Sequence, residues 1–444
     1  MTHPELLAPA GTLKNMNYAF AYGADAVYAG QPRYSLRVRN NDFGLENLRT
    51  GIATAQELGK KFYVASNISP HNAKIKTYIK DMMPIIEMNP DALIMSDPGL
   101  IMMVRETWPE AIVHLSVQAN TVNYATVKFW QSIGIKRVIL SRELSLEEIE
   151  EIRQHCPDIE LEVFVHGALC IAYSGRCLLS GYFNHRDPNQ GTCTNSCRWD
   201  YKMFSAKEDA SGDISRAVSS ATQQAEPIMV KPNAKQLSEE VFLLEEPQRK
   251  GEYMPIFEDE HGTYIMNSRD LRAVQHVEKL LEIGVDSLKI EGRTKSHFYA
   301  ARTSQVYRRA MDNALTGKPF DMSLMVELDS LANRGYTEGF YRRHVPEAYQ
   351  NYEQGNSVST QQQFVGEITG YDEKNQLAEV DVKNKFKIGD QLELMLPTGN
   401  QHFVLETMQD HNGQAMDTAP GGGYQVKIAL PTNKPQMGLI MRNI

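Results

Sequence analysis

Short hydrophobic runs of β type recur along the first part of the chain, and stretches with helical periodicity separate them. This alternation predicts repeated βα units with parallel strands. We expect eight strands, at residues 6–7, 26–28, 62–64, 92–95, 113–115, 138–140, 161–164 and 287–290. Eight βα units close most naturally into a barrel. The sequence therefore predicts an α/β fold whose main domain, residues 1–320, is a TIM-like (β/α)8 barrel.

The regular spacing breaks between Cys170 and Leu288, a gap long enough to hold an insertion. We expect a cysteine-bearing loop at 166–200, followed by a variable insertion at about 205–260. Residues 207–235 are rich in Ser, Ala, Gln and Asp and predict an irregular loop. Residues 264–271 read as a strand leading into an N-capped helix, and this strand competes for a place in the barrel.

The pattern changes again after Pro319. Residues 321–362 are polar and predict a linker, and residues 363–444 alternate in hydrophobicity between turn signals. This alternation predicts a small C-terminal antiparallel β-barrel. Its loop 383–387 places three lysines around Phe386. The loop either grips a phosphate backbone and stacks a base or is a strand edge protected by lysines.

Composition limits the function classes. The 444 residues carry 46 basic and 55 acidic side chains, a formal charge of −9, so any contact with RNA requires a local basic patch. We find neither a leader-like N-terminus nor an apolar stretch of about 18 residues, and we expect a soluble, cytoplasmic protein without a membrane contact. In a reducing compartment, clustered cysteines indicate metal binding or catalysis rather than disulfides.

Four cysteines follow the seventh predicted strand with the spacing Cys-x6-Cys-x15-Cys-x3-Cys: Cys170, Cys177, Cys193 and Cys197. Four thiolates complete one metal site, and both zinc and iron–sulfur clusters accept four cysteines. The absence of a Cys-x2-Cys knuckle and the wide, irregular gaps favour an iron–sulfur cluster. Cys156 stands apart before Pro157, and we interpret it as a buried, incidental thiol that is the one substitute ligand.

Polar residues follow the predicted strands, where the chemistry of such barrels is placed. Loops are solvent-exposed in any protein, so a polar residue at any one strand end needs no functional explanation. We interpret the set as a whole as functional. The substrate-binding candidates among them are Asn67, Gln118, Asn120, Arg142 and Arg293. His166 and Glu291 are the catalytic candidates. We interpret His166 as the proton carrier, because it follows a strand end and a histidine pKa lies near neutrality; the alternative is a hydrogen-bonded histidine that orients the cysteine loop.

Several long runs carry a resemblance to a known family. Residues 162–180 resemble the signature of the collagenase-like peptidase family of unknown catalytic type, number thirty-two in that class. The runs 4–11, 23–30, 286–293 and 334–340 are similar to the same family. The runs 30–40, 140–152 and 187–195 resemble its tRNA-hydroxylating members.

This resemblance implies an enzyme that converts the wobble uridine of certain tRNAs to 5-hydroxyuridine without oxygen, with prephenate as the hydroxyl source. It also implies a 4Fe–4S cluster. Cys170, Cys177 and Cys193 match the family pattern directly, and Cys197 is assigned as the fourth ligand because no cysteine follows it.

A dicarboxylate such as prephenate calls for guanidinium groups, which bind carboxylates with two parallel hydrogen bonds. The candidates are Arg142, Arg293, Arg33, Arg37 and Arg39. Each is alternatively a contact to RNA phosphate or a solvated side chain.

Two other function classes remain open. The family's name indicates a peptidase, although the sequence contains neither a His-Glu-x-x-His pair nor a Gly-x-Ser-x-Gly elbow. A zinc-stapled RNA-binding protein without catalysis is the third class, with the C-terminal barrel as its binding part.

Overall fold

The computed structural model describes residues 4–36, 41–169, 202–208, 214–216, 242–245, 253–256, 258–259, 262–263, 270–331, 336–342 and 362–443. The cysteine loop, apart from residues 166–169, lies outside these ranges, as do Arg37 and Arg39.

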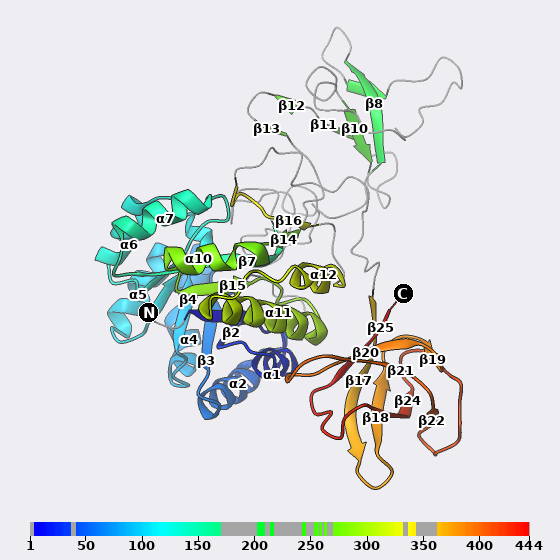
Figure 1. Cartoon of the computed structure of the whole chain (residues 1–444). Coiled ribbons are helices and arrows are strands. Elements are labelled where there is room, and N and C mark those ends of the chain that lie inside the picture. The colour runs from blue at the N-terminus through cyan, green and yellow to red at the C-terminus, as the bar shows by residue number, and fades with distance from the viewer. Residues whose placement is uncertain are drawn as a thin grey trace.

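Eight parallel strands form the predicted barrel (Figure 1). They are β1 (Glu5–Pro9), β2 (Ala26–Gly30), β3 (Lys61–Ser66), β4 (Ala92–Met95), β5 (Val113–Leu115), β6 (Arg137–Ile139), β7 (Glu160–Ala168) and β15 (Ser287–Ile290). Each strand pairs with the next, and β15 pairs with both β7 and β1, which closes the ring. The predicted barrel and its eight strands are confirmed.

Helices cover the outside of the barrel (Figure 1). They are α1 (Leu13–Ala21), α2 (Leu45–Glu57), α3 (Asn72–Ile75), α4 (Tyr78–Ile86), α5 (Pro98–Thr107), α6 (Tyr124–Ser132), α7 (Leu146–His155), α10 (Val277–Ile283), α11 (His297–Leu315) and α12 (Ser323–Asp329), with short 3-10 turns η1 (Val117–Ala119) and η4 (Val274–His276). Side chains cap their first turns: Ser145 and Glu148 form a capping box on α7, and Ser296 accepts from the backbone of Tyr299 on α11. No helix in the described ranges combines the length and the apolar character that crossing a bilayer requires.

The segment between β7 and β15 differs from the expectation in two places. Residues 270–271, expected in a helix, lie in strand β14 (Asp270–Arg272), which pairs antiparallel with β7 outside the ring of eight. Residues 207–208 and 214–216 of the expected irregular loop lie instead in strands β8 (Lys202–Glu208) and β9 (Ile214–Arg216). These strands form a sheet with β10 (Phe242–Glu245) and β11 (Tyr253–Ile256), which follow the expected loop. A second, two-stranded piece joins β12 (Glu258–Asp259) to β13 (Gly262–Thr263).

The predicted linker also contains α12 and the short strand β16 (Tyr336–Thr337), which pairs with β14.

The C-terminal residues form an antiparallel sheet curled into a half-barrel. Its strands are β17 (Gln362–Asp372), β18 (Leu377–Val382), β20 (Gln391–Met395), β21 (Gln401–Val404), β22 (Met408–Asp410), β24 (Gln425–Ala429) and β25 (Leu439–Asn443), and β19 (Phe386–Lys387) pairs with β23 (Thr418–Ala419) beside it. Phe386 is fully buried in the core of this half-barrel. The suggestion that Phe386 stacks a base is therefore wrong, because the alternating pattern turns its ring inward.

The half-barrel is fastened to helices α1 and α11. Tyr18 of α1 donates to the Glu367 carboxylate at 3.1 Å. Phe364 stacks on Phe298 with ring centroids 5.0 Å apart. The fully buried Arg302 donates to the Glu393 carboxylate at 3.0 Å. Because an apolar stack and a buried ion pair join them, we expect the two parts to move together.

The interior of the barrel carries a closed network of buried charges. Arg137 lies 2.6 Å from the Glu5 carboxylate and 3.1 Å from that of Glu162, and Lys289 lies 2.7 Å from Glu162. Tyr63 donates to Glu5 at 2.6 Å. Burial alone raises the pKa of Glu5, but the attraction of Arg137 and its hydrogen bonds outweigh it, so the pKa lies below its ordinary value. These charges satisfy one another within the strands, where barrels of this type ordinarily hold branched apolar residues.

Candidate active site

Arg142 joins three strand ends at the mouth of the barrel. It follows β6, and its guanidinium donates to the backbone oxygen of Ala168 at 2.8 Å and to the Glu291 carboxylate at 3.1 Å. The same group stacks on the ring of Phe164, 3.8 Å from its centroid. Ala168 ends β7 and Cys170 is the second residue after it. Arg142 therefore holds the chain at the point where the cysteine-bearing segment begins.

Two aromatic rings form a floor beneath these groups. The ammonium of Lys289 lies 4.4 Å from the ring centroid of Tyr28 and 5.4 Å from that of Phe164. Arg293 lies 5.6 Å from Tyr28, and Arg142 covers Phe164. Burial raises the pKa of Tyr28 well above its ordinary value, so its hydroxyl stays protonated and donates to the Ile290 backbone. The mouth thus has a neutral floor between cations.

No prediction from the sequence included this floor. A usable signal was present, because Lys289 and Glu162 interrupt runs that are otherwise apolar. A lone charge inside a buried strand requires a partner, which predicts that the two meet inside the barrel.

Arg293 and Asn67 grip the loop after β2 from two sides. Arg293 donates to the backbone oxygen of Leu36 at 2.6 Å, and the Asn67 side chain accepts from the Leu36 N–H at 3.1 Å. Asn67 also donates to Gln118 at 3.1 Å. A β-carbon at Gly30 would lie 2.3 Å from Arg293 Nη1 and 2.4 Å from Ser35 Oγ, so a larger residue would displace both side chains. Arg293, Asn67 and Gln118 therefore form a second group at the mouth, linked through the loop.

His166 does not point into the mouth. The pairing of β7 with β15 shifts by one residue after Phe164, so that His166, rather than Val165, is the partner of Ile290. The imidazole consequently lies behind the barrel wall, with ring centroids 5.8 Å from Tyr299, 5.6 Å from Tyr307 and 5.4 Å from Tyr336. A one-residue slip of this kind moves a side chain to the opposite face of a strand.

The environment of His166 keeps it neutral. Burial, with smaller contributions from Arg272 and Lys295, lowers its pKa from 6.5 to about 3. The prediction that the pKa of His166 lies near neutrality is therefore wrong. Behind the wall, His166 lies 3.4 Å from the Tyr307 hydroxyl, four residues before Cys170.

The remaining predicted residues are more scattered. Asn120 ends η1 in the left-handed conformation, two residues beyond Gln118. Arg33 turns outward to Asp81 on α4, at 2.6 Å, and does not join Arg142 or Arg293. Arg37, Arg39 and the four clustered cysteines lie outside the described residues.

Within the ranges that the structure describes, no three His, Cys, Asp or Glu side chains gather as a metal site. Cys156 is buried, as predicted.

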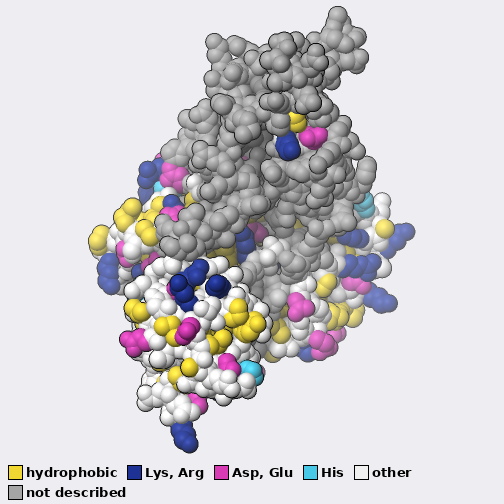
Figure 2. Space-filling model, turned by 90° about the vertical axis from the view of Figure 1, so that its right-hand side faces the viewer, with side chains coloured by type: hydrophobic (Ala, Val, Ile, Leu, Met, Phe, Trp, Pro, Cys, Tyr) yellow, Lys and Arg dark blue, Asp and Glu magenta, His cyan; other side chains and the backbone are white. Residues whose placement is uncertain are grey.

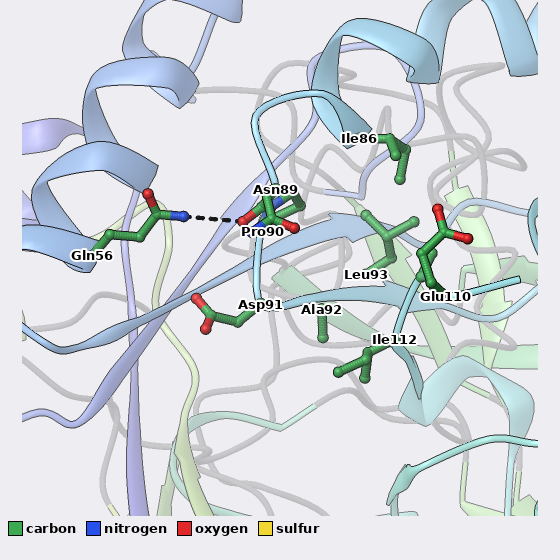
Figure 3. A pocket seen from close by; sticks show the side chains of 10 residues that line it. Gln56, Ile86, Asn89, Pro90, Asp91, Ala92, Leu93, Glu110 and Ile112 are labelled. Carbon is green, nitrogen blue, oxygen red and sulfur yellow. Dashed lines mark hydrogen bonds between the residues drawn. The ribbon is translucent and has the colours of Figure 1, made fainter. Parts of the chain in front are cut away.

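A pocket of about 330 Å³ lies at the other end of the barrel (Figure 3). It is lined by the turns that precede β4 and β5, including Asn89, Asp91 and Glu110, and by Gln56, which donates to the Asn89 backbone at 3.1 Å. The N-terminal ends of barrel strands serve stability rather than chemistry. This pocket is therefore separate from the candidate active site.

Comparison with known proteins shows the family to which this chain belongs. The model of peptidase family U32 matches residues 11–351, and that of the peptidase family U32 C-terminal domain matches residues 360–442. The chain is 65% identical to tRNA hydroxylation protein P of Escherichia coli (strain K12), over 100% of the chain and 97% of the relative. It is 62% identical to the protein of the same name from Haemophilus influenzae, over 99% and 96%. A 23S rRNA 5-hydroxycytidine synthase of Escherichia coli is 26% identical, over 83% of the chain and 47% of the relative.

Proposed function

Because this chain belongs to peptidase family U32, and its similar relatives are named for tRNA hydroxylation, we propose that it is a tRNA-modifying enzyme that hydroxylates uridine. In this proposal it forms 5-hydroxyuridine at the wobble position, without oxygen and with prephenate as the hydroxyl source. The observation that carries the proposal is the set of contacts made by Arg142, which holds the start of the cysteine segment against Glu291 at the barrel mouth.

The four cysteines would hold a 4Fe–4S cluster. Four thiols are a donor set that suits such a cluster, and the described chain reaches Leu169, one residue before Cys170, at the mouth. When bound there, the cluster supplies electron transfer, which side chains alone do poorly. Cys177, Cys193 and Cys197 complete the proposed ligand set.

The arginines would bind the dicarboxylate. The Nε of Arg142 is buried and has no hydrogen-bond partner in the described part of the chain, whereas its two terminal nitrogens are held by Ala168 and Glu291. A carboxylate that accepts from Nε would satisfy this buried donor. Arg293 supplies a second positive charge across the floor formed by Tyr28 and Phe164. Two carboxylates would thus find two cations on opposite sides of a neutral floor.

Proton transfer at the mouth falls to Glu291 in this proposal. Its carboxylate faces Arg142, whereas the neutral His166 lies behind the wall. His166 instead acts as a positioning residue for the end of β7, through the Tyr307 hydroxyl that also donates to the Val165 backbone at 2.6 Å.

Purification without air tests the proposal. We expect a broad absorption band near about 400 nm together with iron and sulfide, and loss of both in Cys197→Ser. Cys156→Ala is the matched control and should keep the band. Nucleoside analysis of tRNA from cells that lack the gene should show 5-hydroxyuridine restored by the wild type and not by Cys197→Ser. A colourless, zinc-containing protein, or tRNA that stays unmodified with the wild type present, would refute the proposal.

A further inference from the structure

Four basic residues lie on the loop after β2 and on the segment after β3, and we call them the lysine patch: Arg33, Lys74, Lys76 and Lys80. The Lys74 ammonium donates to the Arg33 backbone oxygen at 3.4 Å, which brings the two segments together. Between Glu57 and Asp81 the sequence contains five lysines and no carboxylate, in a chain with a net charge of −9. On the face drawn in Figure 2, Lys and Arg side chains lie in separate groups, one on the half-barrel and others along both edges of the molecule. Positive charge is thus concentrated locally, as an RNA contact on an acidic protein requires.

The patch is built around one carboxylate that serves as an internal anchor. Asp81 accepts from Arg33 at 2.6 Å, from Tyr34 at 2.6 Å and from Thr77 at 2.9 Å. The hydrogen bond from Tyr34 does most to lower the pKa of Asp81. The Tyr34 hydroxyl oxygen also lies 3.2 Å from the backbone oxygen of Lys74. Asp81 therefore fixes the loop after β2 against α4.

Lys76 and Lys80 remain available to a ligand. Both are exposed, and neither forms an ion pair within the described residues. Arg33 is half exposed and stands 5.6 Å from the ring of Tyr34, which limits its motion. The patch therefore presents its charges from a backbone that is already fixed. Binding of a polyanion then costs little free energy for ordering the protein backbone.

The patch is continuous with the candidate active site. Leu36, three residues after Arg33, is held by Asn67 and Arg293 of the mouth. Strand β3 ends at Ser66, and α3 begins at Asn72, so the lysines follow the same end of the barrel. One loop therefore links the mouth to the patch.

We propose that the lysine patch binds the phosphate backbone of the tRNA while the base to be modified enters the mouth. This inference rests on the proposed function. Phosphate contacts position a nucleic acid without reading its sequence, and lysine ammonium groups suit that task as point charges. The patch would set the register of the RNA on the enzyme, and the groups at the mouth would select the base.

A pair of double variants of the full chain tests the proposal. K76Q/K80Q removes two charges from the patch, and K136Q/K318Q removes two exposed charges next to β6 and after α11, at the far end of the barrel. Binding of fluorescently labelled tRNA is followed by anisotropy between about 50 and 200 mM salt. We expect K76Q/K80Q to lose affinity on the order of ten-fold at low salt, with the salt slope reduced by about 1 to 2. K136Q/K318Q should match the wild type, and K76R/K80R should retain binding.

The outcomes separate this inference from the proposed function. Equal affinities for the two glutamine pairs, with the wild type binding tRNA, would overturn the patch and leave the proposed function standing. Patch-dependent binding without restored 5-hydroxyuridine in cells would support the patch and sink the hydroxylase. A wild type that binds no tRNA at any salt concentration would overturn both.

Discussion

The interior of the barrel and its mouth are both lined with charge, but the charges are used differently. In the interior, Arg137, Glu5 and Glu162 satisfy one another, and their distances of 2.6 and 3.1 Å leave no room for a ligand. At the mouth, Arg142 and Arg293 each donate a hydrogen bond to a backbone oxygen of a neighbouring segment. The difference teaches that buried charge in this fold can hold strands together at one level and hold functional segments in place at the next.

The largest expected effect comes from opening the interior network. Arg137→Met should lower the free energy of unfolding by about 3 to 5 kcal/mol, because it leaves buried carboxylates without their main partner. Urea unfolding measures this loss. Arg142→Met is the matched control at the mouth, where Glu291 is partly exposed, and its loss should be smaller. Equal losses would remove the distinction between the two regions.

A second variant tests the mouth by enzymatic activity instead of stability. Arg142→Lys keeps the charge but cannot hold both Ala168 and Glu291 in the same geometry, so we expect about a 10²-fold lower rate of tRNA hydroxylation. The free energy of unfolding should change little. Single-turnover assays with anaerobic protein measure the rate, and iron content should be determined in parallel. An unchanged rate would argue that the mouth is not the site of chemistry.

The wall behind the mouth should respond to pH. The folded protein keeps His166 neutral down to a pH of about 3, its pKa, whereas the unfolded chain binds the proton below about 6.5. Stability should therefore fall as the pH decreases from about 6.5, with up to about 1.4 kcal/mol per pH unit due to this group. His166→Phe should remove that part of the slope in urea unfolding. Replacement of the exposed His71 is the control and should leave the slope as it is.

The smallest effect concerns Cys156, at the end of α7 before β7. Its thiol is buried and lies 3.6 Å from the Tyr124 backbone oxygen. Cys156→Ala should cost about 1 kcal/mol in unfolding free energy. Iron content should not change, since this thiol lies at the opposite end of β7 from Cys170. Loss of iron would make Cys156 a ligand and require a different arrangement of the chain.

The sequence predicted the barrel because strand and helix periodicities are local signals, and all eight strands appear where they were expected. It also indicated that polar residues follow the carboxyl ends of the strands. In the structure Arg142 contacts Glu291 there, and Arg293 and Asn67 both contact the Leu36 backbone. The sequence did not predict the residue-by-residue register between paired strands. The shift after Phe164 turns His166 outward, and nothing in the letters of β7 marks that slip. The burial of Phe386 and the floor of Tyr28 and Phe164 likewise depend on contacts between distant segments. The proposed ligand role of the clustered cysteines stays a prediction, because they lie outside the described residues.

The closure of the ring has a consequence for how this barrel can change over evolutionary time. The chain leaves the ring after Ala168 and comes back at Ser287, yet β7 and β15 pair directly. The entropy lost in joining the ends of a loop grows only with the logarithm of its length, so a doubling costs only about 0.6 kcal/mol. The excursion can therefore lengthen, shorten or exchange its contents at little expense to the ring. New substrate contacts can be tried there while the strands that carry the mouth stay in register.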